Sequence, residues 1–434
     1  MRKALLATFL VPVIVSLASC GGGGGSTLSA SGTGGSGGPP VTTAAANVAT
    51  MTVDAGPISS SPAVDTPYIT VTVCVPGSTT QCQTFNDIEV DTGSYGFRIL
   101  ADATSTTGTP FDLNLPPEND TNGEPFAECA QFVDGFSWGP VVTAAVEVSG
   151  ETAANVPIQV VGDPTVSGES SFPAVPSQCS GTGTSEDTVA TFGANGILGV
   201  GPFAQDCGEG CAVTLDNGTY FVCPPAGCEP STMALDAQVT NPVFDFATDN
   251  NGIIVELPAL GAAGTAASST GALVFGIGTA GNNQLNASTI LAADQYGDIT
   301  TSFDGQSLPY SYLDTGSNAY YFNDSAIPDT CISSADWFCP TNTLTLTATN
   351  LGTNGTQSTV DISIANAATV FDDNPDNTAF NDIGASAGNQ STYCPNGANN
   401  CSFDFGLPFF FGRDVYIAYA NENTSAGPGP FYAY

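Results

Sequence analysis

The tetrapeptide Asp-Thr-Gly-Ser occurs twice in the sequence, at residues 91–94 and again at residues 314–317. In both copies an apolar residue, Val90 or Leu313, runs directly into the aspartate. At this composition a given tetrapeptide is expected far less than once per chain, so two copies by accident are improbable. The two aspartates are therefore expected to work as a pair.

Two carboxyl groups about 3 Å apart cannot both be ionised at the same time, so they share one proton. The ionised member can take a proton from a bound water as that water attacks a carbonyl, and the protonated member can polarise the carbonyl oxygen. Asp91 and Asp314 are the predicted catalytic residues. The residues that follow them are expected to shape and orient the pair: Thr92, Gly93, Ser94, Thr315, Gly316 and Ser317.

Basic residues are almost absent from the chain, which has 41 Asp and Glu, no His, and only Arg2, Lys3, Arg98 and Arg413. The lack of His excludes Ser-His-Asp triads, Cys-His dyads and His-ligated metals. Four basic residues are too few to form a nucleic-acid-binding surface. We predict that no cofactor or metal is needed. Crowded carboxylates should have raised pKa values in the folded state, so we expect higher stability near about pH 4 than about pH 8.

The N-terminus has the pattern of an export signal. Arg2 and Lys3 precede an apolar run at residues 4–17, and the run ends in Leu-Ala-Ser-Cys at residues 17–20. This ending resembles the bacterial lipobox, which implies that Cys20 carries lipid; the alternative is an ordinary signal peptide with a chance Cys. The Gly/Ser/Thr-rich residues 21–43 predict a flexible tether. Because Gly21 is not Asp, the lipoprotein sorting pattern implies an outer-membrane location facing the periplasm or the exterior.

Thirteen cysteines leave twelve once Cys20 is assigned to lipid, and export to an oxidising compartment predicts up to six disulfides. Spacing favours the pairs Cys74–Cys82, Cys331–Cys339, Cys394–Cys401 and, more loosely, Cys129–Cys179. The remaining cluster fits either disulfides of open connectivity or a four-thiolate zinc site: Cys207, Cys211, Cys223 and Cys228. The Asp/Asn-rich residues 372–377 predict a solvated loop rather than a calcium site.

Short segments of alternating β-branched and aromatic residues recur along the chain, separated by Asn-Gly, Asp-Gly, Pro-Gly and Gly-Ser turns. Convincing long amphipathic helices are absent, so an all-β fold is predicted. Residues 201–231 are rich in Cys, Gly and Pro, which indicates an extended loop region cross-linked by disulfides. The small residues at 259–270 indicate a connection between two halves.

The sequence resembles the pepsin-like aspartic proteases from about Tyr68 to the C-terminus. In that family an apolar pair followed by Gly threads beneath each aspartate loop. Residues 196–201, Gly-Ile-Leu-Gly-Val-Gly, match the first such motif, and residues 409–414, Phe-Phe-Phe-Gly-Arg-Asp, match the second. The chain also resembles an uncharacterised family of bacterial lipoproteins with the same twin motifs. The resemblance implies two related β-barrel-like lobes, an active site in the cleft between them, and an extended polypeptide substrate.

The resemblance also implies a hairpin flap over the cleft, which in the family carries a Tyr hydroxyl near the substrate. Alignment by spacing places Phe132 at that position, and the indole N–H of Trp138 is the candidate substitute. The predicted flap is residues 132–139. No basic prosegment is present. Arg98 and Arg413 are expected to form structural ion pairs, the alternative being recognition of a substrate carboxylate.

These features predict a monomeric aspartic endopeptidase that contacts the membrane only through its lipid. Its expected organisation is a signal peptide at 1–19, a lipidated Cys and tether at 20–48, and lobes at 49–258 and 259–434. The alternative is a non-catalytic binding or structural lipoprotein of the envelope that retains the fold. A glycosidase with two carboxylates is a third class, and the twin motifs argue against it.

Overall fold

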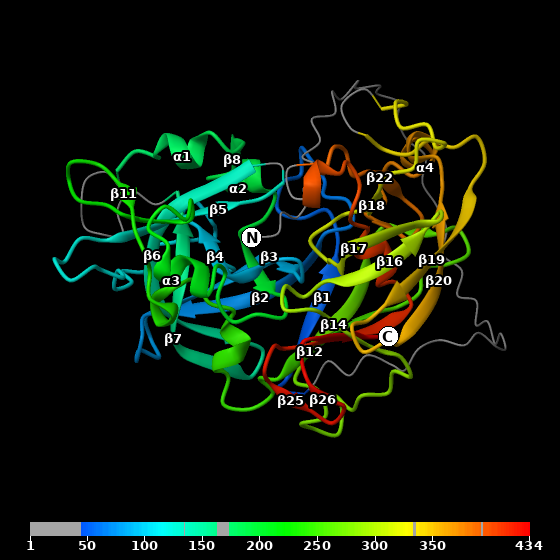
Figure 1. Cartoon of the computed structure of the whole chain (residues 1–434). Coiled ribbons are helices and arrows are strands. Elements are labelled where there is room, and N and C mark those ends of the chain that lie inside the picture. Colours follow the sequence, from blue (N-terminus) through cyan, green and yellow to red (C-terminus); the bar gives the residue numbers. More distant parts are fainter. Residues whose placement is uncertain (1–44, 134, 163–172, 333–335, 392–393) are drawn as a thin grey trace, which may run out of the picture.

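The computed structural model describes residues 45–133, 135–162, 173–332, 336–391 and 394–434. The predicted lipid site Cys20 and most of the predicted tether lie outside these residues. The described chain is built of strands in two lobes, one blue to green and the other yellow to orange in Figure 1. Its longest helix, α4 (Ala367–Asp373), has only seven residues. The predicted all-β, two-lobed fold is therefore confirmed.

The strands and helices of the first lobe come mainly from the first half of the chain. They are β1 (Val48–Val53), β2 (Pro67–Cys74), β3 (Cys82–Asp91), β4 (Tyr95–Leu100), β5 (Phe126–Gln131), β6 (Gly135–Val148), β7 (Glu151–Val161), α1 (Ser177–Ser180), β8 (Thr184–Ser185), α2 (Val189–Phe192), β9 (Gly196–Val200), α3 (Glu209–Val213), β10 (Tyr220–Val222) and β11 (Glu229–Pro230). Two 3₁₀ turns follow, at Leu235–Ala237 and Pro242–Asp245.

The elements that follow along the chain build the second lobe and the sheet that joins the lobes. They are β12 (Gly252–Leu257), β13 (Thr265–Ala266), β14 (Ser269–Phe275), β15 (Ile290–Ala292), β16 (Ile299–Phe303), β17 (Gln306–Leu313), β18 (Tyr320–Phe322), β19 (Leu344–Leu351), β20 (Gln357–Ile364), β21 (Ala379–Phe380), β22 (Gly384–Ser386), β23 (Asp404–Phe405), β24 (Arg413–Ala418), β25 (Asn423–Thr424), β26 (Gly427–Pro428) and β27 (Phe431–Ala433). Short 3₁₀ turns lie at Pro395–Gly397 and Leu407–Phe409.

Alternation along the strands sets which side chains enter the core. In β19, Thr345 and Thr347 are exposed, whereas Ala348 and Asn350 are buried. The lobes are joined by a continuous ladder in which β1 pairs with β2 on one side and with β14 on the other, and β14, β12, β24 and β27 follow in order. This shared sheet, near the bottom of Figure 1, fixes one lobe relative to the other.

A parallel strand lies beside the strand that delivers each aspartate. In the first lobe β9 runs parallel to β3, with Leu198 opposite Val90 and Gly199 opposite Asp91, as the sequence predicts. In the second lobe the strand beside β17 is β23, with Phe405 opposite Leu313. The prediction that residues 409–414 fill this place is wrong. Residues 407–409 form a 3₁₀ turn, and β24 starts at Arg413 against β12.

The misplaced motif has a simple physical reason. The true second motif, Asp404-Phe405-Gly406, has a carboxylate where an apolar residue is expected, so the apolar run just after it matches the pattern better. Gly406 nevertheless meets the steric requirement of the position. A Cβ atom there would lie 2.0 Å from the carbonyl oxygen of Ala319.

All four predicted disulfides form: Cys74–Cys82, Cys129–Cys179, Cys331–Cys339 and Cys394–Cys401. The open cluster resolves into Cys207–Cys211 and Cys223–Cys228, which rules out the four-thiolate zinc alternative. Within the described ranges, no group of three or more His, Cys, Asp or Glu is placed to hold a metal ion. The described part of the chain also contains no helix long and apolar enough to span a membrane.

Candidate active site

The two tetrapeptides form facing loops at the ends of β3 and β17. Both aspartates, Asp91 and Asp314, are fully buried. In each loop the first carboxylate oxygen accepts a hydrogen bond from a backbone N–H two residues later: Gly93 N–H to Asp91 Oδ1 at 2.7 Å, and Gly316 N–H to Asp314 Oδ1 at 2.8 Å. The tight turn therefore fixes the orientation of both carboxyl planes in the same way.

Two threonines tie the loops together by reciprocal hydrogen bonds. The backbone N–H of Thr92 donates to Thr315 Oγ1 at 3.1 Å, and the backbone N–H of Thr315 donates to Thr92 Oγ1 at 3.0 Å. Each hydroxyl also donates across the interface, Thr92 Oγ1 to the Leu313 carbonyl at 3.0 Å and Thr315 Oγ1 to the Val90 carbonyl at 2.6 Å. Four buried hydrogen bonds thus hold the loops in register, with every donor and acceptor satisfied.

The loops approach too closely for any side chain at the glycines. A Cβ atom on Gly93 would lie 2.5 Å from Asp314 Cγ, and one on Gly316 would lie 2.6 Å from Asp91 Oδ1. Each glycine therefore packs on the aspartate of the opposite lobe. The residue type is required by space, since neither glycine has a positive φ.

The electrostatics of the pair follow from its burial. Burial raises the pKa of Asp314 well above its usual value, and the nearby carboxyls of Asp91 and Asp404 raise it further. The carboxyl of Asp91 lies near enough to raise the pKa of Asp314 through both its charge and hydrogen bonding. Two buried carboxyls in contact retain one proton between them because the doubly ionised state is strongly disfavoured. The pair can therefore supply one base and one acid at once.

The serines of the two motifs differ in their surroundings. Ser317 Oγ lies 3.0 Å from Asp314 Oδ2 and 2.6 Å from Asp404 Oδ2. Ser94 Oγ is buried and has no hydrogen-bond partner among the described residues. Sequence reasoning overlooked Asp404. The only signal for it was an acid immediately before a Phe-Gly pair, at a position that normally belongs to the core.

The predicted flap is the hairpin of β5 and β6, whose tip closes with the Phe132 N–H donating to the Gly135 carbonyl at 2.8 Å. Phe132 packs edge-on against Phe192 at 5.8 Å between ring centroids. Trp138 lies on the opposite side, in an apolar cluster with the Cys129–Cys179 disulfide, and its indole N–H donates to the Pro173 carbonyl. The structure therefore brings Phe132, and not Trp138, towards the Asp91 loop.

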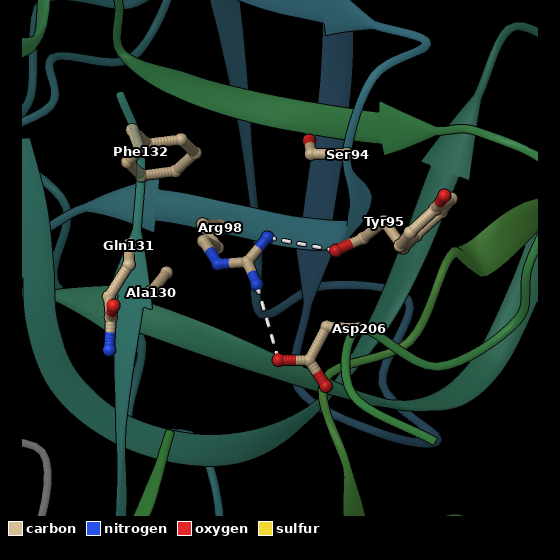
Figure 2. Close-up of a pocket in the computed structure, with 7 residues that line it drawn as sticks. All are labelled: Ser94, Tyr95, Arg98, Ala130, Gln131, Phe132 and Asp206. Atoms are coloured by element: carbon tan, nitrogen blue, oxygen red, sulfur yellow. Dashed lines mark hydrogen bonds and ion pairs between the residues drawn. The ribbon is translucent and has the colours of Figure 1, made fainter. Parts of the chain in front are cut away.

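A small pocket of about 10 Å³ lies between the flap tip and the Asp91 loop (Figure 2). Phe132 and Ser94 lie at its upper edge in that view, and the guanidinium of Arg98 lies across its middle. Arg98 donates to both carboxylate oxygens of Glu128 and to the Tyr95 carbonyl, and forms an ion pair with Asp206 at 3.5 Å.

The predicted bidentate ion pair of Arg98 is thus confirmed, with Glu128 as its partner. Tyr220 Oη completes the cluster by donating to Asp206 Oδ1 at 2.5 Å. Burial raises the pKa of Asp206 well above its usual value, and Glu128 raises it further. Arg413 behaves differently from the prediction. In the described part of the chain it has no ion pair; it donates to the Phe409 carbonyl and lies over the Phe409 ring at 4.4 Å.

A larger cavity of about 60 Å³ is lined in part by Gly316. Apolar side chains supply much of its lining: Ile58, Val64 and Phe192. Gly316, which packs on Asp91, therefore separates this cavity from the aspartate pair. This cavity is not evident from sequence, because its walls come from four separate segments.

A model for a family described as "Protein of unknown function (DUF3443)" matches residues 43–434. Among solved structures, the aspartic proteinase from Irpex lacteus is similar to this chain in fold, with a TM-score of 0.51 and 16% sequence identity. The match covers 90% of this chain and 97% of that proteinase. No curated protein matches the chain in sequence. At this identity the likeness establishes a bilobal pepsin-like fold and nothing about activity.

Proposed function

The chain belongs to the family described as "Protein of unknown function (DUF3443)", and we propose that it is an aspartic endopeptidase in which Asp91 and Asp314 form the catalytic dyad. The observation that carries this proposal is the reciprocal pair of Thr92 and Thr315 hydrogen bonds, which holds two buried carboxyls in contact. A fold that had lost catalysis would have no need to retain both carboxyls, because two buried acids in contact are destabilising.

The proposed chemistry uses one proton shared by two carboxyls. The ionised carboxyl removes a proton from water as the water oxygen bonds to the carbon of the scissile amide. The protonated carboxyl gives its proton to the amide oxygen, so the tetrahedral intermediate is neutral. Collapse of the intermediate breaks the C–N bond: the proton taken from water passes to the leaving amine, and one hydroxyl proton of the intermediate returns to the other carboxyl. The product is a carboxylic acid, and the dyad again holds one proton. On the protein, every proton transfer uses only the carboxyls of Asp91 and Asp314.

The substrate is proposed to be a polypeptide in extended conformation between the lobes. Extended chains bind by strand-like backbone hydrogen bonds, with alternate side chains in pockets. The cavity beside Gly316 is partly lined by apolar side chains and has room for part of one such side chain. The β5–β6 hairpin supplies backbone groups over the Asp91 loop, and Phe132 supplies an apolar tip.

The enzyme is further proposed to act as a monomer at the bacterial cell envelope, anchored to the outer membrane through lipid on Cys20. The sequence pattern at residues 2–20 supports this placement. Expression of the full chain in a bacterial host with a clickable fatty acid tests it directly. Label should appear in the wild-type chain and be absent from Cys20→Ser; equal labelling of both would refute the anchor.

The test of catalysis uses the full chain, solubilised in detergent with disulfides intact, and a complex peptide mixture. Cleavage products are identified by mass spectrometry over a range of pH. Asp91→Asn and Asp314→Asn should each abolish cleavage. Asp361→Asn is the matched control, because Asp361 is exposed on β20 of the second lobe. Cuts that persist in either dyad variant would refute the proposed mechanism.

The competing function is a binding or structural lipoprotein that keeps the fold without the reaction. The observation that favours it is Phe132, which gives the flap tip no hydroxyl near the substrate. Under this alternative the wild type and both dyad variants are equally inactive while remaining folded. Co-purification of an envelope partner with wild type and dyad variants alike would then identify the role.

A further inference from the structure

The hydroxyl of Ser317 lies between two buried carboxyl groups. Its oxygen is 3.0 Å from Asp314 Oδ2 and 2.6 Å from Asp404 Oδ2, and Asp404 is only 2% exposed. A serine hydroxyl has one hydrogen, so it can donate to only one of the two carboxyls. The other contact is a hydrogen bond only when that carboxyl carries a proton and donates to Ser317. The arrangement therefore requires at least one proton on Asp314 or Asp404.

Asp404 departs from the internal symmetry of the fold. It pairs with Tyr312, two residues before Asp314. In the first lobe the residue at this place is Ile197, which pairs with Glu89, two residues before Asp91. The same strand position is thus apolar beside one aspartate and acidic beside the other. The first lobe shows that the fold does not need a carboxyl there.

The surroundings of Asp404 contain acids and phenols. Asp91 and Asp314 face it from the two loops, Tyr312 from β17, and Tyr321 is its partner on β18. The described salt bridges are all made by Arg98, which lies in the first lobe. Burial raises the pKa of Asp404 well above its usual value; hydrogen bonds from the Ser317 and Tyr312 hydroxyls oppose that rise, and the Asp91 charge adds to it. No described ion pair involves Asp404, so a proton is the only group available to neutralise this carboxyl.

We propose that Asp404 is a positioning residue of the dyad, which through Ser317 adds a third carboxyl to the proton-sharing unit and keeps the dyad singly protonated to higher pH. This role rests on the proposed function. In the working state three carboxyls hold two protons: Asp404 donates to Ser317 Oγ, Ser317 donates to Asp314 Oδ2, and the second proton is shared by Asp91 and Asp314.

As pH rises, the proton on Asp404 leaves first, because loss of the dyad proton would place two negative charges in direct contact. Ser317 can then reverse, donating to Asp404 and accepting from a protonated Asp314. The negative charge left on Asp404 holds the remaining proton on the dyad more tightly. The alkaline limb of activity therefore lies at higher pH than the dyad alone would give.

The first experiment compares wild type, Asp404→Asn and the exposed control Asp361→Asn, all as full chains. The measurement is the pH dependence of kcat/KM on a peptide that the wild type cleaves. In Asp404→Asn the alkaline limb should move about one pH unit lower, a loss of about tenfold in kcat/KM beyond the limb, with little change on the acid side. Asp404→Ile, copied from Ile197, should shift in the same direction. An unmoved limb in a folded, active Asp404→Asn protein would overturn the proposal.

A second readout does not depend on catalysis. Infrared difference spectroscopy distinguishes protonated carboxyls from carboxylates by their carbonyl stretch. At about pH 6 the wild type should show one more buried, protonated carboxyl than Asp404→Asn, since ordinary carboxyls are ionised there. Identical spectra would refute the three-carboxyl unit even if no substrate were found. An inactive wild type would instead refute the proposed function, with the spectra still deciding whether Asp404 carries a proton.

Discussion

Replacement of Thr315 by valine is the most direct test of how the two aspartate loops are held together. Thr315 is fully buried, and its hydroxyl donates to the Val90 carbonyl at 2.6 Å and accepts from the Thr92 N–H at 3.1 Å. Valine has nearly the same shape, so packing is kept while both partners lose their hydrogen bond. A buried polar group left without a partner costs about 1–3 kcal/mol, so two such groups should cost about 2–6 kcal/mol.

The control is Thr315→Ser, which keeps the hydroxyl and removes one methyl group, at a cost of about 1 kcal/mol. The mirror variant Thr92→Val should cost as much as Thr315→Val, because Thr92 Oγ1 makes the equivalent pair of hydrogen bonds to Leu313 and Thr315. Agreement between the two valine variants would show that the loops share one energetic unit.

Unfolding in urea, with disulfides intact, provides the measurement. The chain has two tryptophans, Trp138 in the first lobe and Trp337 in the second, and both are buried, so fluorescence reports on both lobes. Thr315→Val should lower the free energy of unfolding well below that of Thr315→Ser at an unchanged m-value. Equal stability of the two variants, within about 0.5 kcal/mol, would show that these hydrogen bonds contribute no net stability.

Three further perturbations have defined outcomes. Burial and the Asp414 charge raise the pKa of Glu256 to about 7, and burial raises the pKa of Asp382 to about 6. The stability that these protonated groups contribute is fully present below about pH 4 and is lost as pH rises through the two values, so the melting temperature should fall between about pH 5 and about pH 8. A melting temperature that does not fall, or that falls equally in Glu256→Gln, would contradict this. Arg98→Met should destabilise the first lobe by about 3–5 kcal/mol, because Glu128 stays buried without its cation, and Arg98→Met/Glu128→Leu should recover part of the loss in the same urea assay. The Cys129–Cys179 disulfide closes a loop of 50 residues, and replacing both cysteines by alanine should lower the free energy of unfolding by about 4 kcal/mol. The Cys74–Cys82 disulfide closes only 8 residues, so its removal should cost less. Equal costs for the two disulfides would count against stabilisation by loop entropy.

The features predicted correctly from sequence are those encoded by neighbouring residues. Strands follow from alternation, and three of the four predicted disulfides close loops of at most eight residues. The aspartate loops were recognisable because each is a continuous tetrapeptide at the end of an apolar strand. Their assembly by Thr92 and Thr315, across 223 residues, was implied by the duplication alone.

Features that depend on distant strands were harder to predict. Arg98 pairs with Glu128 and Asp206, which are 30 and 108 residues away in the sequence. The residues around Arg98 give no indication of which acids these partners are. Asp404 is difficult to predict because a polar residue at position 404 departs from the apolar motif expected there. The apolar run at 409–411 matches that motif better than residues 404–406 do. The sequence of residues 132–139 does not show which of its aromatic side chains faces the cleft, and in the structure Trp138 faces the Cys129–Cys179 disulfide instead.

The shortage of bases links the stability of this protein to its proposed chemistry. Arg98 and Arg413 are the only cations in the described chain, and both are engaged elsewhere, Arg98 with Glu128 and Asp206 and Arg413 with Phe409. The buried carboxyls that Arg98 does not pair with can be neutralised only by protons. The conditions that keep a proton on the dyad are therefore the conditions that stabilise the fold. On the alkaline side, activity and stability should decline in the same direction, and separating them requires substitutions such as Asp404→Asn that remove one carboxyl at a time.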